Sequence, residues 1–184
     1  MSRIKSAWEI ALEKTKDIVL DEARYRAETL EKEGMALAGG FLNDNEQKIE
    51  NLQARLASYS GEDYKTVRKG IIKTIFANLN LPSDSSYRLR FDRTCALCAL
   101  ADESGQASQV VAGIGDFFEQ FLQAREEFSK RMEAQLRQAM QENPEQVNTA
   151  QYAKLIEQNV KRMEDQYSGA LENTKETLRQ VFGE

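Results

Sequence analysis

Cys95 and Cys98 are the residues of this chain whose spacing most resembles a chemical site. Two cysteines separated by two residues can form a redox dithiol or half of a zinc site. A structural zinc ion needs four ligands, but the sequence contains two cysteines and no histidine. A redox pair should follow a strand at a helix N-terminus, whereas this pair lies among small apolar residues. We predict two buried structural thiols, with an intermolecular metal or disulfide site and a redox function as alternatives.

Gly113 and Gly115 form a Gly-Ile-Gly-Asp segment that resembles part of a phosphate-binding loop. The third glycine of the dinucleotide fingerprint is missing and no parallel-sheet pattern surrounds the segment. We interpret it as a helix kink or a delayed helix start near Asp116. The lack of histidine also excludes histidine-based triads and general bases. We therefore predict no catalytic residue, no cofactor and no metal, and we do not expect an enzyme.

Basic residues gather between positions 65 and 93, where seven basic and two acidic residues give a local charge of +5 in a chain of −5. The candidate partner-binding residues are Lys65, Arg68, Lys69, Lys73, Arg88, Arg90 and Arg93. Tyr64, Tyr87 and Phe91 interleave with them, a combination that suits phosphate contacts with base stacking or an acidic protein partner. We favour the simpler interpretation, a basic face that docks on acidic helices of its own chain or of a dimer mate. An acidic protein partner comes next and nucleic acid last.

Two long amphipathic helices are predicted to follow, one over residues 107–140 and one after Pro144. Apolar residues recur at steps of three and four, which places them on one stripe of each helix. A stripe of this length must be buried against a partner, so we expect a coiled-coil-like antiparallel hairpin. We predict that Phe118, Phe121, Phe128 and Met132 form an oligomer seam, in a homo-oligomer or against a protein partner.

Shorter helices are predicted before the hairpin, over residues 3–38, 44–59 and from about 61 to Leu81. Gly39-Gly40 and Leu81-Pro82 are expected to end the first and third of them. Caps are expected from the Asn43-Asp44-Asn45 segment and from Ser60, the latter as a capping box with Asp63. Trp8 is expected to anchor the first helix in the core.

Residues 87–91 alternate apolar and basic side chains, which is a strand signal. Five residues are few and no second strand is evident, so we favour a helix that begins at Ser85 or Ser86 and keep a short extended segment as the alternative. Residues 94–101 are predicted to form a buried helix, and residues 102–105 a loop.

The sequence thus predicts an all-α fold in one helical protein, with shorter helices over 1–105 and the long hairpin over 106–184. No apolar run approaches the roughly 20 residues that span a bilayer, and we expect a cytoplasmic protein. The preferred function is a non-catalytic scaffold, adaptor or stalk-like protein that acts through helix-mediated association. The alternative is a nucleic-acid or nucleoprotein-binding factor that uses residues 65–93. A redox or metal protein that uses Cys95 and Cys98 is the third and least favoured class.

Overall fold

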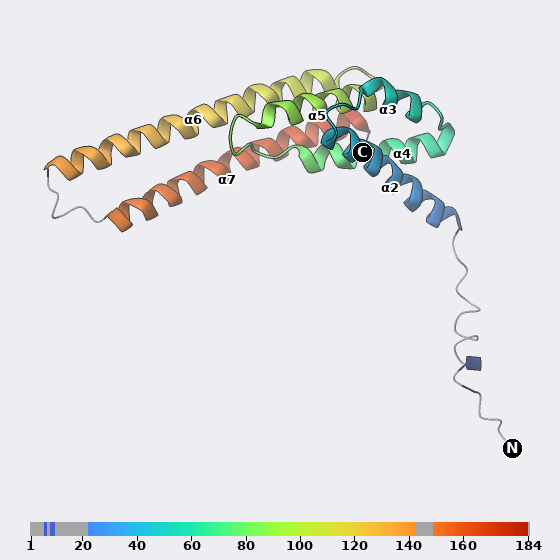
Figure 1. Cartoon of the computed structure of the whole chain (residues 1–184), viewed down its shortest axis with the longest axis horizontal. Coiled ribbons are helices and arrows are strands. Elements are labelled where there is room, and N and C mark those ends of the chain that lie inside the picture. The colour runs from blue at the N-terminus through green and yellow to red at the C-terminus, as the bar shows by residue number, and fades with distance from the viewer. Residues whose placement is uncertain (1–5, 7, 10–21, 143–148, 184) are drawn as a thin grey trace.

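A computed structural model describes residues 6, 8–9, 22–142 and 149–183, and it confirms the all-α prediction (Figure 1). Every regular element among these residues is a helix. In chain order they are α2 (Glu22–Asn43), α3 (Ile49–Leu56), α4 (Gly61–Asn78), α5 (Tyr87–Ala101), α6 (Ala107–Glu142) and α7 (Thr149–Phe182). Within this part of the chain, no helix combines the length and the apolar character that crossing a bilayer requires.

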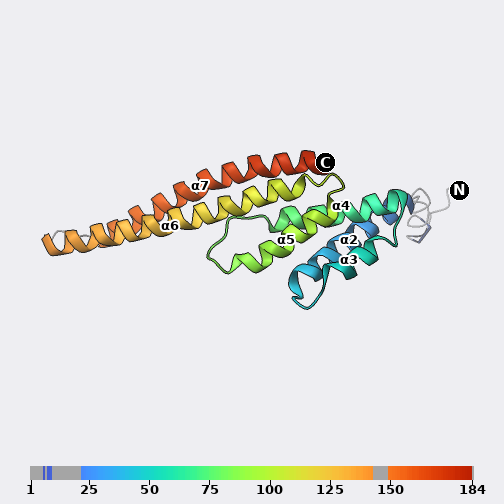
Figure 2. The same cartoon turned by 90° about the horizontal axis from the view of Figure 1, so that it is seen from above.

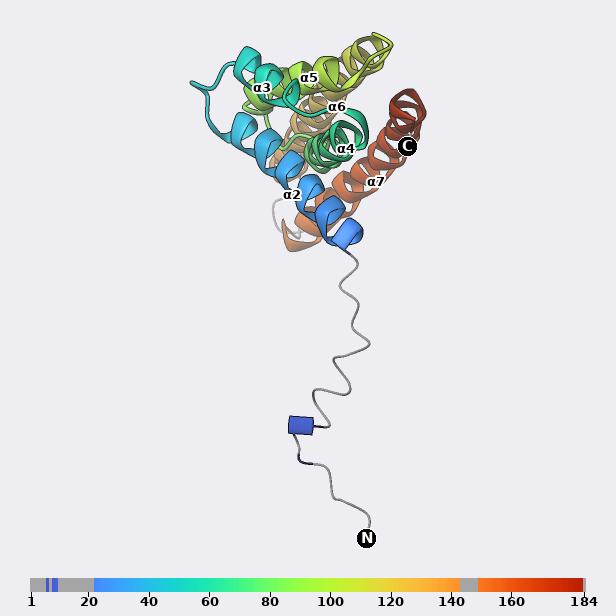
Figure 3. The same cartoon turned by 90° about the vertical axis from the view of Figure 1, so that its right-hand side faces the viewer.

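Helix α4 lies at the centre of the helices when the molecule is viewed along its long axis (Figure 3). Val67, Ile71, Ile72 and Ile75 are fully buried, and their spacing makes α4 apolar around a wide part of its circumference. Helices α2, α3 and α5 pack against it, and the Phe182 ring at the end of α7 meets Phe76 edge-on at 6.0 Å. This central helix therefore holds the N-terminal helices and the end of the chain together.

Helices α2 and α4 cross with their backbones in contact, at Gly34 and Gly70. A Cβ atom added to Gly34 would lie 2.0 Å from the Val67 carbonyl oxygen, and one added to Gly70 would lie 2.1 Å from the Glu31 carbonyl oxygen. Real Cβ atoms essentially never approach other atoms below 3.0 Å. Only glycine at both positions therefore permits this crossing.

Helices α6 and α7 form an antiparallel hairpin, side by side in two views (Figures 1 and 2). The first half of α6 packs on α5 and buries Val111, Ile114 and Phe118. Its second half extends past the shorter helices, accompanied by α7 (Figure 2). We call residues 122–142 and 149–167 the distal arm, and the rest of the helices the head. The lengths of 36 and 34 residues agree with the predicted pair of long helices.

The predicted helix stop at Gly39-Gly40 is wrong, because α2 continues through both glycines to Asn43. Phe41 and Leu42 follow the glycines and are both buried. Burying two such side chains is worth roughly 3–6 kcal/mol, whereas two helical glycines cost about 2 kcal/mol. Residues 3–5, 7 and 10–21 of the predicted first helix lie outside the described residues.

Several other predicted helix ends also differ from the structure. The second helix is shorter than predicted because the Asp44 carboxylate accepts a hydrogen bond from the Glu46 amide at 3.0 Å, which makes a turn there. Ser60 does occupy the N-cap position of α4, but its side chain makes no capping hydrogen bond. Helix α4 ends at Asn78, before the predicted Leu81.

Helices α5 and α6 settle the remaining predictions about secondary structure. Residues 87–91 are helical, as favoured, and the loop over 102–105 is confirmed. The delayed start near Asp116 is wrong, since α6 begins at Ala107. The Asp102 carboxylate explains that earlier start, because it accepts a hydrogen bond from the Ala107 amide at 2.6 Å and so caps the first turn.

Trp8 is not the predicted core anchor, because its side chain is 73% exposed. The nearby Ser6 and Glu9 exchange side-chain to backbone hydrogen bonds at 2.8 and 3.2 Å, the reciprocal pattern of a capping box.

Candidate functional site

The three lysines of the basic region lie on the exposed side of α4, where each contacts a glutamate. Lys65 donates to Glu62 at 2.6 Å within the same helix. Lys69 and Lys73 both approach Glu31 of α2, the first with an N–O separation of 3.9 Å and the second through a direct hydrogen bond. These contacts therefore draw α2 onto α4 as well as neutralising the lysines.

Arg88 and Arg90 point to different neighbours because residues 87–91 are helical. Two residues along a helix differ in direction by about 200°. Arg88 binds both carboxylate oxygens of Glu119 on α6, at 3.1 and 2.9 Å. Arg90 instead donates to the side-chain oxygens of Asn78 and Asn43, at 2.9 and 3.4 Å. The two arginines thus do not form one continuous basic face.

Arg93 lies over the connection between α2 and α3. Its guanidinium stacks on the Phe41 ring, 3.9 Å from the ring centre. It donates to the carbonyl oxygens of Phe41, Asp44 and Gln47, at 2.7, 2.8 and 2.8 Å. The C-terminal carbonyls of a helix lack partners within the helix, so a cation at that point satisfies them.

Arg68 makes a similar connection between the ends of two other helices. Its guanidinium donates to the Ala101 carbonyl oxygen at 2.7 Å and to the Phe182 carbonyl oxygen at 3.3 Å. These carbonyls end α5 and α7. Arg68 therefore ties α4 to both helix ends at once.

Each of the seven candidate basic residues thus contacts a partner within its own chain, and the structure distributes them over several sides of the head. Their assignment to an external partner stays a prediction. Sequence reasoning missed the role of Arg68 and Arg93 at helix ends. Their partners lie between 33 and 114 residues away along the chain, so no local pattern indicates them.

Tyr87, Arg88 and Glu119 form a small charged cluster where α5 meets α6. The Tyr87 hydroxyl donates to Glu119 at 2.5 Å. Hydrogen bonds from Tyr87 and Arg88 lower the pKa of Glu119, and burial together with Glu119 raises the pKa of Tyr87 to about 12. Glu119 is therefore held as a carboxylate and Tyr87 as a neutral phenol. This arrangement joins two helices and leaves neither group poised for proton transfer near neutral pH.

Cys95 is half-buried and Cys98 is buried, and the structure shows both as free thiols. Burial is the largest cause that raises the pKa of Cys95 to about 11, with the Asp92 carboxylate adding to it. Burial also raises the pKa of Cys98 well above its ordinary range. The thiolate is the reactive form, so both groups are weak nucleophiles at neutral pH. Among the described residues, no group of three or more cysteine, aspartate or glutamate side chains is placed to hold a metal ion.

The first two predicted seam residues, Phe118 and Phe121, are buried within a single chain. Phe118 contacts the rings of Tyr87 and Phe91 at 5.5 and 5.3 Å between ring centres. Phe121 contacts Tyr167 of α7 at 5.1 Å. These rings pack where α5, α6 and α7 meet, so they join the hairpin to the head.

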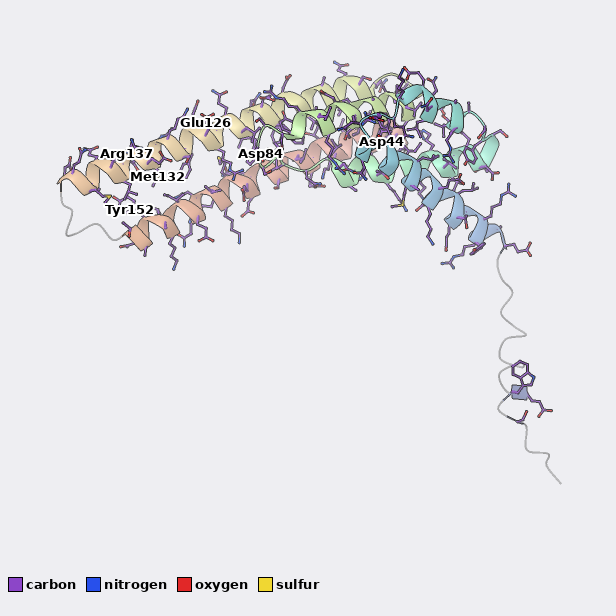
Figure 4. All side chains as sticks on the ribbon, in the orientation of Figure 1. Asp44, Asp84, Glu126, Met132, Arg137 and Tyr152 are labelled. Atoms are coloured by element: carbon purple, nitrogen blue, oxygen red, sulfur yellow. The ribbon has the colours of Figure 1, made fainter. Side chains whose placement is uncertain are left out.

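The other two predicted seam residues lie on the distal arm, where the apolar stripe is less covered. Met132 is buried, but Phe128 is half-buried. Met140 and Leu155 are 48% and 47% exposed. Figure 4 shows Met132, with Glu126 and Arg137, along the part of α6 that extends past the head. The distal arm therefore presents apolar side chains that two helices alone do not cover.

A surface hollow of about 300 Å³ lies at the base of the distal arm, between Pro82, Phe121 and Ser168. Arg125 and Glu164 also line it, and Arg125 donates to the Ser83 carbonyl oxygen at 2.8 Å. In the described part of the chain no hydrogen bond joins the Ser168 hydroxyl to the Glu164 carboxylate, so the hollow has the features of an incompletely filled junction between helices.

A comparison with known protein families places the chain in one of them. The family described as "Family of unknown function (DUF6657)" matches residues 53–180, more than half of the 184 residues, and the chain belongs to that family. The match covers α4 to α6 and most of α7. No curated protein and no solved structure matches the chain.

Proposed function

We propose that this member of the DUF6657 family is a non-catalytic helical scaffold or adaptor, which binds helices of a protein partner or of a second copy through its distal arm. One observation carries the proposal: the apolar stripe of the arm remains partly exposed, with Met140 and Leu155 about half accessible. Apolar patches of this kind on helices are characteristic of association surfaces. A cytoplasmic location belongs to the same proposal.

The charges of the head support this choice over nucleic-acid binding. A nucleic-acid site needs basic side chains that are available to phosphates. Here Arg68 and Arg93 bind carbonyl oxygens, while Lys69, Lys73 and Arg88 face carboxylates. Phosphate binding would have to break these contacts, whereas helix association at the arm leaves them in place.

The proposal can be tested by affinity capture with the full chain as bait. The informative variant is Met140→Lys with Leu155→Lys, and Ala134→Lys is the matched control. Ala134 is exposed and lies about 200° around α6 from the buried Met132. Proteins retained by the wild type and the control but lost with the double variant support association through the arm. An identical set of retained proteins for all three baits contradicts it.

A further inference from the structure

The distal arm has the properties of a surface that pairs with itself. We propose that two copies associate through their distal arms, in antiparallel orientation, to form a four-helix bundle with one head at each end. This inference rests on the proposed function, because it identifies the occupant of the same apolar stripe as a second copy of the chain. Three features of the arm support this occupant: the incomplete burial of its apolar stripe, its charge and its size.

The incomplete cover follows the hairpin seam along both helices. On α6, Phe128 and Leu136 are half-buried and Met140 is exposed. On α7, Ile156 and Val160 are half-buried, and Leu155 beside them is exposed. Two paired helices leave a seam open along its edges, whereas four helices around one axis enclose it. The side chains that a second hairpin would cover are therefore already aligned along the length of the arm.

The charge of the distal arm is balanced, which suits a copy of itself better than a strongly charged partner. The described residues of the arm carry seven basic and seven acidic side chains. The basic ones are Arg125, Lys130, Arg131, Arg137, Lys154, Lys161 and Arg162; the acidic ones are Glu126, Glu127, Glu133, Glu142, Glu157, Glu164 and Asp165. Seven minus seven leaves no net charge, although the whole chain carries −5. Two arms can therefore approach without net repulsion.

The acidic head favours the antiparallel orientation. Because the described arm is neutral, the negative charge of the chain lies almost entirely outside it. A parallel pair would place two acidic heads side by side, where like charges repel. An antiparallel pair places them at opposite ends of the bundle, roughly 30 Å of arm apart. A two-fold axis through the middle of the arm then relates the copies, which is the commonest symmetry of homo-oligomers.

The size of the arm is sufficient for a reversible dimer. Residues 122–142 span about 31 Å at 1.5 Å per residue, and two adjacent helices are about 20 Å wide. One face of the arm thus offers about 600 Å², and two faces together bury about 1,200 Å². This area lies at the lower limit of specific stable interfaces. We therefore expect dissociation in the micromolar range.

Sedimentation velocity of the purified full-length chain, from about 1 to 100 μM, tests the inference around the expected dissociation constant. The wild type and the control Ala134→Lys should pass from monomer to dimer over this range. The double variant Met140→Lys/Leu155→Lys should dissociate at least ~100-fold more readily, because four half-exposed apolar side chains lose their cover across one dimer. Circular dichroism should show unchanged helicity, since the replaced side chains are not in the core.

Disulfide trapping tests the orientation in a background where Cys95 and Cys98 are replaced by serine. Asn159→Cys, near the middle of the arm and one turn from both Leu155 and Ile156, should cross-link to its own copy. Thr149→Cys, at the tip, should not, because it faces the base of the partner arm. Cross-linking at Thr149, with or without cross-linking at Asn159, overturns the antiparallel arrangement. A dimer that cross-links at neither position overturns the arm as its interface.

The two proposals fail in different ways. A wild-type chain that stays monomeric at 100 μM, about tenfold above a dissociation constant of ~10 μM, overturns the second copy as occupant. If affinity capture then still depends on Met140 and Leu155, the scaffold proposal stands with a different protein as partner. If capture does not depend on them, both proposals fall.

Discussion

Replacing Gly34 or Gly70 with alanine should destabilise the protein, although alanine is the better helix former. Position 34 requires the larger adjustment: its Cβ would lie 2.0 Å from the Val67 carbonyl oxygen, 2.9 Å from the carbonyl carbon and 3.1 Å from the Gly70 Cα. Close carbon–oxygen contacts are about 3.3 Å. The two helices would therefore have to separate by about 1.3 Å at the crossing.

The cost of this separation can be worked from the packing around the crossing. The clashing atoms are backbone, so they cannot rotate aside as the end of a side chain could. A gap of 0.5–1 Å removes about a quarter to a half of each dispersion contact. Overpacking usually costs about 1–3 kcal/mol, and the rigid neighbours here place Gly34→Ala at or above the upper limit. Better helix propensity returns about 1 kcal/mol. We expect a net loss of about 2–3 kcal/mol in the free energy of unfolding.

Gly39→Ala is the matched control, because Gly39 lies in the same helix with no heavy atom within 4 Å of its added Cβ. It should stabilise the protein by up to about 1 kcal/mol. Urea unfolding followed by circular dichroism at the helix signal measures both variants. Gly34→Ala combined with Gly70→Ala should cost less than the sum of the two, since one separation relieves both clashes. If Gly34→Ala and Gly39→Ala change stability by the same amount and sign, the backbone contact does not limit the crossing and the reasoning fails.

Four further outcomes are expected. Arg93→Met should lower the free energy of unfolding by about 1.5–3 kcal/mol in urea titrations, because it leaves three carbonyl oxygens without their charged donor. An unchanged urea midpoint would show that water fully replaces the guanidinium as the donor to these oxygens. Phe121→Ala should cost about 3–5 kcal/mol in the same assay, and a loss below about 0.5 kcal/mol would place the ring on the surface. Folding raises the pKa of Cys95 from 9.0 to about 11, so the contribution of this thiol to stability is present below pH 9 and is lost as the pH rises toward 11. Between pH 9 and 11 the free energy of unfolding should therefore fall less for Cys95→Ser than for the wild type. An equal fall with pH for the two proteins would contradict this. Finally, we expect no gel retardation of nucleic acid at about 50 mM salt, where phosphate contacts are still strong; a shift that Arg88→Glu abolishes would favour the alternative function.

The periodic helices were predictable from the sequence, because long amphipathic stripes leave few other ways to bury apolar residues. The stripe from Phe118 to Met132 identified α6, and its continuation after Pro144 identified α7. The ends of the shorter helices were less predictable, because tertiary burial can override a local signal. Phe41 is the example: its burial carries α2 through two glycines that would otherwise end a helix.

The contacts that position the candidate site could not be predicted, because they join residues far apart along the chain. In the sequence alone, Gly34 and Gly70 look like ordinary helix residues. The need for glycine becomes visible only where α2 and α4 cross in the structure. In the sequence alone, Arg68 and Arg93 look like surface charges. Their role depends on the fold, which brings carbonyl oxygens at helix ends within hydrogen-bond distance of them. For the arm, the sequence indicated which residues are apolar but not which are covered. Phe121 and Met140 belong to the same stripe, yet one is enclosed by the head and the other is exposed.

Helix α6 runs without interruption from the head into the distal arm, so the molecule contains a lever. Its first half is fixed by buried Ile114 and Phe118, and its second half carries the exposed Met140 about 30 Å farther along. A stiff rod held at one end transmits a load on its tip as a torque at its support. A partner that bends or tilts the arm must therefore strain the packing of Phe118 against α5. Events at the tip reach the head mechanically, through one helix and without any intervening hinge loop.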